Sequence, residues 1–233
     1  MHASRRYGLA QVAIAVAGVE AYEVSRSLLT PNWPLADRHA HLVFDWERAA
    51  HLDWEAALQA AVLRVPGLEY ALELFYFAAH FALTAAFFLW LYRRSAGGFR
   101  LFRNAFLAAT AIALVVHWRF PTAPPRLAGV GLVHPGLGLA SLSNPVAAVP
   151  SLHAGWALGV GIGVVRYARP LAWRVAGALY PAAICVTIVA TGNHFVLDAV
   201  AGMAVLGVGF AAAAVLDFRV RRGVEQSGSS PGS

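Results

Sequence analysis

The stretch NPVAAVPSLHAGWALGVG, residues 144–161, passes from a polar turn directly into an apolar helix. Ser151 stands where the helix begins, and serine is a preferred cap of helix N-termini. His153 falls in the first turn, at the mouth of a segment apolar enough to enter a membrane. A titratable side chain in that position is a candidate functional residue, and the rest of the sequence indicates which function it could have.

The whole chain has the composition of an integral membrane protein. Of its 233 residues, 59% are hydrophobic and only 13% are charged, which is more apolar than ordinary soluble domains. Spanning a bilayer takes roughly 20 apolar residues, and six segments are candidates, near residues 8–29, 68–92, 101–118, 152–168, 171–191 and 193–216. The predicted fold class is therefore an all-α integral membrane protein with six transmembrane helices in one bundle.

These spans predict a single domain, residues 1–222, followed by a small, polar tail, residues 223–233, that is expected to be disordered. Every one of the 18 basic residues is an arginine, and the net charge is +6. Because the arginines flank apolar runs, they favour membrane lipids over nucleic acid as partners. The absence of lysine is typical of a GC-rich bacterial genome. Oligomeric state is left open.

The distribution of arginine predicts the orientation of the chain. Twelve of the 18 arginines lie at one set of span ends, namely Arg5, Arg6, Arg93, Arg94, Arg100, Arg103, Arg166, Arg169, Arg174, Arg219, Arg221 and Arg222. Positively charged loops stay in the cytoplasm, so both termini are predicted to be cytoplasmic in a bacterial cytoplasmic membrane. The opposite span ends then face outside.

An amphipathic helix is predicted between the first two spans, in DWERAAHLDWEAALQAAVLRV, residues 45–65. Its apolar face comprises Ala50, Trp54, Ala57, Leu58, Ala61 and Val65, and the residues away from that face are Glu47, Arg48, Glu55 and Gln59. Such a helix is expected to lie on the outer leaflet. It would serve either as a lid over a lipid site or as a simple connector.

Polar residues gather at the outer ends of three segments that are far apart in sequence: HWRFPTAPPRL, PSLHAG and TGNHFVLDAVAG. His194 and Asp198 are four residues apart and share a helical face. The carboxylate can hold one imidazole nitrogen and leave the other as nucleophile or base. Alternatively, the two side chains only hydrogen-bond to each other at the membrane interface and have no catalytic role.

The two other segments offer groups for binding phosphate. The helix that begins after Ser151 presents free N–H groups, which favour an anion, and His153 can donate a proton there. Arg119 and Arg126 offer guanidinium forks for phosphate oxygens. Alternatively, these residues face water or anchor lipid headgroups. Together the groups describe a site for phosphoryl transfer.

Further polar residues in the spans leave other functions open. Glu73, Tyr76 and His80 share one face of the second span, where they line a headgroup cavity or form a buried polar network. Histidines could instead bind haem in an electron carrier, the candidates being His80, His117, His153 and His194. A third possibility is a non-catalytic scaffold or transport protein.

The motifs R-x6-R, PSLH and GNHxxxD resemble the three signature motifs of the type-2 phosphatidic acid phosphatase superfamily. The form PSLHAG, preceded by FPTAPPR, is most similar to the branch with inositol phosphorylceramide synthases and their bacterial relatives. The resemblance implies a lipid phosphate substrate and no metal or other cofactor. It also implies site residues: His194 as nucleophile, Asp198 as its orienting partner, His153 as general acid, and Arg119, Arg126, Ser151, Leu152 and Asn193 as phosphate ligands.

The chain departs from the family pattern at several positions. Arg119 stands where a lysine is usual, Leu127 replaces a proline, Leu152 replaces a glycine, and Ile188 replaces an arginine of the third motif. One phosphate ligand is therefore missing, and Thr191 or Asn193 is a candidate neutral substitute. Fewer cations suit a phosphodiester better than a monoester. The lipid, and whether water or an alcohol accepts the phosphoryl group, stay open.

Overall fold

The computed structural model describes residues 32–132 and 146–228, with side chains up to Phe218. Its regular elements are α2 Trp33–Ala49, α3 Glu55–Leu63, α4 Leu68–Leu74, the π-helical η1 Phe75–Ala79, α5 His80–Arg94, α6 Ala96–Arg119, α7 Leu152–Tyr167, α8 Leu171–Ala190 and α9 Val196–Gly228. The span expected at residues 8–29 lies outside the described residues. Within them the fold is all-α, as predicted.

Four helical stretches of the described chain are long and apolar enough to cross a membrane: Leu68–Arg94, Ala96–Arg119, Leu171–Ala190 and Val196–Phe218. Each corresponds to a predicted span. The segment predicted at 152–168 forms α7, which has only 16 residues and is not among the four. The membrane character of the protein is thus confirmed, while the described residues provide four such helices rather than six.

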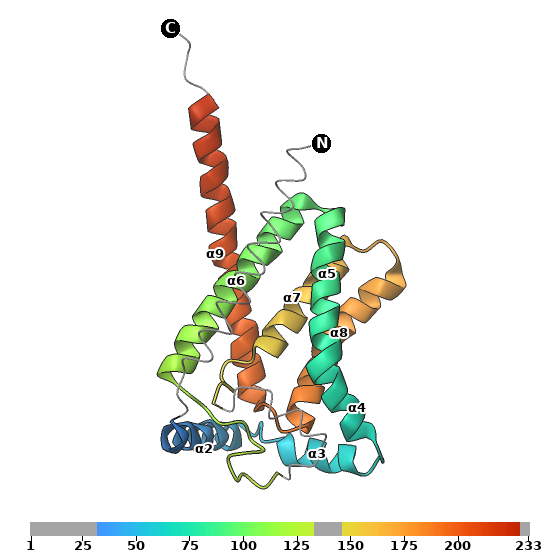
Figure 1. Cartoon of the computed structure of the whole chain (residues 1–233), viewed down its shortest axis with the longest axis vertical. Coiled ribbons are helices and arrows are strands. Elements are labelled where there is room, and N and C mark those ends of the chain that lie inside the picture. The colour runs from blue at the N-terminus through green and yellow to red at the C-terminus, as the bar shows by residue number, and fades with distance from the viewer. Residues whose placement is uncertain (1–31, 133–145, 229–233) are drawn as a thin grey trace.

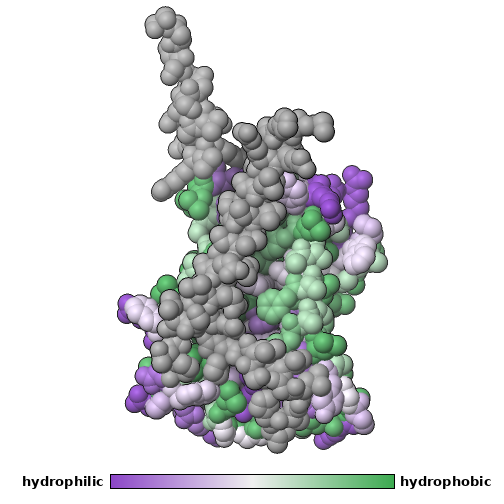
Figure 2. Space-filling model, viewed as in Figure 1, coloured by the Kyte–Doolittle hydropathy of each residue, from purple (hydrophilic) through white to green (hydrophobic). Residues whose placement is uncertain are grey.

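Helices α5 to α9 form a bundle, and α2 and α3 lie across one end of it (Figure 1). Within the bundle, α9 packs along α6 and α7, and α7 packs along α8. Where coloured residues are visible beside the grey atoms in Figure 2, the middle of the bundle is mainly hydrophobic, hydrophilic residues gather at the upper right, and the end with α2 and α3 carries both kinds. At the end away from α2, helix α9 continues to Gly228, past residue 223, where the disordered tail was expected to begin.

The single amphipathic helix predicted between residues 45 and 65 is instead the end of α2 followed by the separate helix α3. The chain breaks after α2 at His51, which adopts a left-handed φ of 56°. Glu47, Glu55 and Gln59, which were placed away from the apolar face, are buried against the rest of the protein, whereas Trp54 of the apolar face is exposed. The physical reason for two of these burials is that Glu47 and Glu55 accept hydrogen bonds from the amides of Leu197 and Val196 at the start of α9.

Close packing of α7 against α9 brings two helix starts together. A Cβ on Gly155 would lie 2.7 Å from the Gly202 carbonyl oxygen, and a Cβ on Gly202 would collide with the backbone of Ser151. Small residues are what allow helices in a membrane to approach so closely. The amide of Ser151 donates to the carbonyl oxygen of Asp198 at 2.9 Å. The first turns of α7 and α9 therefore lie side by side and are joined by a hydrogen bond.

Candidate active site

The turn between α8 and α9 positions the predicted nucleophile. Gly192 has a left-handed φ of 65°, which a glycine adopts without a steric penalty. After it, the amides of Asn193 and His194 both donate to the carbonyl oxygen of Ile188 at 3.0 Å. His194 is thus held on a tight turn that is tied back to the last turn of α8.

The imidazole of His194 is held in one tautomer. Its Nδ1 lies 3.0 Å from the carbonyl oxygen of Ala148 and 3.2 Å from Oδ2 of Asp198. Because a carbonyl oxygen can only accept a hydrogen bond, Nδ1 carries the proton and Nε2 keeps its lone pair. The contact expected between His194 and Asp198 is present, and its geometry suits a nucleophilic Nε2.

His153 lies opposite His194, in the first turn of α7. The two ring centroids are 5.9 Å apart, with the ring planes at 50°. Ser151 caps the helix as expected, its Oγ accepting from the amide of Ala154 at 3.4 Å. Leu152 opens α7, so its N–H has no acceptor within the helix. The Nε2 atom of His153 has no hydrogen-bond partner in the part of the chain that the structure describes.

Arg126 reaches the α8–α9 turn from the segment that follows α6. Its amide donates to the carbonyl oxygen of Gly192 at 3.0 Å, and its guanidinium donates to Oδ1 of Asn193. Nδ2 of Asn193 in turn donates to Oγ1 of Thr191 at 2.7 Å. Of the two candidate substitutes for the missing third-motif arginine, Asn193 therefore contacts Arg126 and Thr191 supports Asn193. A direct phosphate contact from Asn193 stays a prediction.

Arg119 is not brought to the histidines. It is exposed, and its guanidinium carbon lies 4.7 Å from the ring centroid of Trp118. Arg126, by contrast, is buried. Burial lowers the pKa of its guanidinium, while the nearby Tyr76 and Glu73 act in the opposite direction. The structure thus places one of the two predicted arginines at the site and sets acidic groups near it.

Two of the three residues predicted to line a headgroup cavity pack against the ring of His153. Glu73, Tyr76 and His80 are all buried, on either side of and within the π-helical turn η1. The Tyr76 and His153 ring centroids are 4.2 Å apart, and those of His80 and His153 are 5.0 Å apart. Nδ1 of His80 is 2.8 Å from the hydroxyl of Tyr180. Both earlier interpretations, cavity wall and polar network, are compatible with this packing against His153.

One residue at the site had no role in the motifs. His117 is buried, and its Nε2 lies 3.2 Å from the carbonyl oxygen of Pro150, the residue before Ser151. It therefore holds the segment that leads into α7. The burial of His117 could have been predicted from its spacing. It lies four residues after Ala113, on the same buried face of α6 as Ala105, Ala109 and Ala113.

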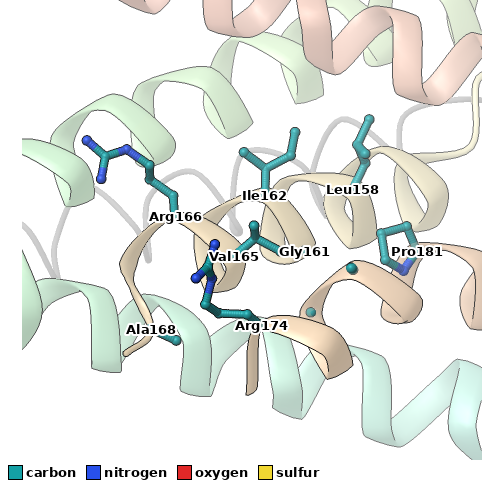
Figure 3. Close-up of a pocket in the computed structure, with 10 residues that line it drawn as sticks. Leu158, Gly161, Ile162, Val165, Arg166, Ala168, Arg174 and Pro181 are labelled. Carbon is teal, nitrogen blue, oxygen red and sulfur yellow. The ribbon is translucent and has the colours of Figure 1, made fainter. Parts of the chain in front are cut away.

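A cavity of about 650 Å³ lies between α7 and α8, with Arg166 and Arg174 in its wall (Figure 3). None of the predicted site residues lines it. Arg166 is thirteen positions after His153, about 20 Å along an α-helix. In the described part of the chain, no three His, Cys, Asp or Glu side chains gather as a metal site would require.

The chain was compared with known protein families, curated proteins and solved structures. A family model described as the PAP2 superfamily matches residues 41–212, a range that includes both histidines, Asp198 and Arg126. No curated protein and no solved structure matches the chain.

Proposed function

The chain belongs to the PAP2 superfamily and is a phosphatase-type phosphoesterase of the membrane; from this premise we propose that it cleaves lipid phosphate esters through a phosphohistidine on His194. The observation that carries the proposal is the tautomer of His194. Its Nδ1 proton is shared by Ala148 and Asp198, which reserves the lone pair of Nε2 for attack on phosphorus.

The proposed reaction has two displacements. Nε2 of His194 attacks phosphorus, the bond from phosphorus to the lipid oxygen breaks, and a protonated His153 gives its proton to that oxygen. The phosphorylated imidazole carries a positive charge, which the carboxylate of Asp198 stabilises. In the second step, His153 takes the proton of water or of an alcohol as its oxygen attacks phosphorus, and the phosphorus–nitrogen bond breaks.

The charge of the site favours a phosphodiester substrate. Arg126 is the arginine placed beside the α8–α9 turn, whereas Arg119 is exposed. Glu73 lies near enough to influence Arg126. A phosphodiester carries one negative charge and needs fewer cations than a dianionic monoester. We therefore propose that the enzyme transfers a phosphodiester-derived group, of the phosphoinositol type, to an alcohol, in line with the branch its motifs resemble.

One assay tests this function. The purified protein is incubated with a panel comprising phosphatidic acid, a polyprenyl diphosphate and phosphatidylinositol, with and without an alcohol acceptor. We expect turnover of phosphatidylinositol to exceed that of phosphatidic acid, to persist in EDTA and to be inhibited by vanadate, which mimics five-coordinate phosphorus. Activity lost to EDTA and restored by magnesium or zinc would refute the metal-independent histidine mechanism.

We also propose that six helices span the membrane, including residues 8–29 and α7, with the histidines facing outside and both termini in the cytoplasm. The prediction uses two exposed positions, Asp53 between α2 and α3 and Gly97 in the first turn of α6. The α2–α3 layer and the turn between α5 and α6 lie at opposite ends of the bundle (Figure 1). In a Cys185→Ala background, Asp53→Cys should react with an impermeant thiol reagent added to intact cells. Gly97→Cys should react only after permeabilisation. The reverse pattern would place the site in the cytoplasm.

A further inference from the structure

Two carboxylates on the layer that crosses the end of the bundle contact the start of α9. Glu47 of α2 and Glu55 of α3 are 0% and 2% exposed. Oε1 of Glu47 accepts from the amide of Leu197 at 2.7 Å, and Oε1 of Glu55 accepts from the amide of Val196 at 3.2 Å. These bonds join segments that are far apart in sequence, directly beside the predicted nucleophile.

The bonds replace an ordinary helix cap. The first N–H groups of a helix have no acceptor within it, and a neighbouring side chain of the same segment usually caps them. At the start of α9, the only one of these amides that donates to the carboxylate of Asp198 is that of Phe195, at 2.9 Å. The next two amides depend on α2 and α3. The start of α9 is therefore held from outside the bundle.

The position of this helix start decides the geometry of the site. Oδ2 of Asp198 also meets Nδ1 of His194, and the carbonyl oxygen of Asp198 accepts from the amide of Ser151. Ser151 in turn begins the helix that carries His153. A displacement of the first turn of α9 would thus alter the setting of both histidines.

The charges at this helix start are consistent with a structural cap. Burial raises the pKa of Glu47 to about 9; the amide of Leu197 opposes that shift, and the neighbouring Glu55 and Asp198 carboxylates add to it. Burial therefore favours the neutral form of the Glu47 carboxyl group, whose Oε1 accepts from the amide of Leu197. A glutamine has the same shape and also offers a neutral oxygen acceptor.

We propose that Glu47 and Glu55 are positioning residues that clamp the first turn of α9, and through it the histidines, to the α2–α3 layer. They do not touch the reacting atoms. The effect on turnover rests on the function proposed above, whereas the effect on α9 is independent of it.

The test compares alanine and glutamine variants. Glu47→Ala and Glu55→Ala should each accelerate hydrogen exchange at the amides of residues 195–198 about tenfold, because a buried hydrogen bond is lost. They should lower kcat by a similar factor with little change in KM. Asp45→Ala and Asp53→Ala are matched controls, since these carboxylates are exposed and two residues away, and should leave both quantities unchanged.

Rescue by the conservative variant separates a clamp from a general loss of structure. Glu47→Gln and Glu55→Gln keep the acceptor and should stay within about twofold of the parent in exchange and kcat. If the alanine variants do not fold, Glu47→Asp and Glu55→Asp shorten the acceptor by one methylene and carry the same expectation. Parental exchange in the alanine or aspartate variants, or glutamine variants as defective as alanine, would overturn the clamp. If the parent shows no turnover, the exchange measurement alone decides.

Discussion

Replacing His194 with alanine is expected to abolish turnover with every substrate, by a factor on the order of 10⁴ or more. The substitution removes the atom that receives the phosphoryl group, and loss of a covalent nucleophile is among the most damaging changes an enzyme can suffer. No leaving group can compensate, because the missing step is the attack itself. Activity on a lipid ester and on an aryl phosphate ester should therefore fall alike.

The covalent intermediate gives this prediction a second measurement. A phosphorus–nitrogen bond is labile in acid and stable in alkali, so labelled parent protein should lose its label in acid only. His194→Ala should take up no label. His41→Ala is the matched control, because His41 is exposed on α2 and its loss should change neither label nor turnover. Label that persists in His194→Ala would mean that another residue is the nucleophile.

The local parts of this site could be predicted from sequence. The contact of His194 with Asp198 was expected from a spacing of four on one helix face, and it is present although His194 precedes α9 and Asp198 reaches back to it from the first turn. The cap by Ser151 follows from its place before an apolar run. The start of the second span, predicted at residue 68 from its apolar run, agrees with the start of α4 at Leu68. In each case the residues involved are neighbours along the chain.

The parts that failed depend on contacts between distant segments. Glu47 and Glu55 are on the polar face of any helix drawn for residues 45–65, and only their bonds to the start of α9 explain their burial. The break at His51 has no glycine or proline to announce it. The spacing of Arg119 and Arg126 did not reveal that the first is exposed and the second buried. Tertiary packing decides which way the chain runs after the end of α6, and therefore which of these two side chains becomes buried.

The contribution of His153 is expected to depend on the leaving group. The residue lies across from His194, at 5.9 Å between ring centroids, and its Nε2 has no partner among the described residues. A protonated imidazole there can deliver a proton to the departing oxygen but takes no part in forming the phosphorus–nitrogen bond. Without it the attack still occurs, and the oxygen must leave as an anion.

His153→Ala should therefore lose about 10²–10⁴-fold on lipid esters, the usual range for general acid catalysis. A lipid alkoxide is a poor leaving group and needs that proton, whereas p-nitrophenolate is stable without it. The loss on p-nitrophenyl phosphate esters should be at least tenfold smaller, and the acid-labile label should still form from them. His41→Ala again serves as the control. The contrast with His194→Ala, which loses both substrates equally, is what assigns the two roles: equal losses for His153→Ala would remove it from proton transfer and leave it a part in binding.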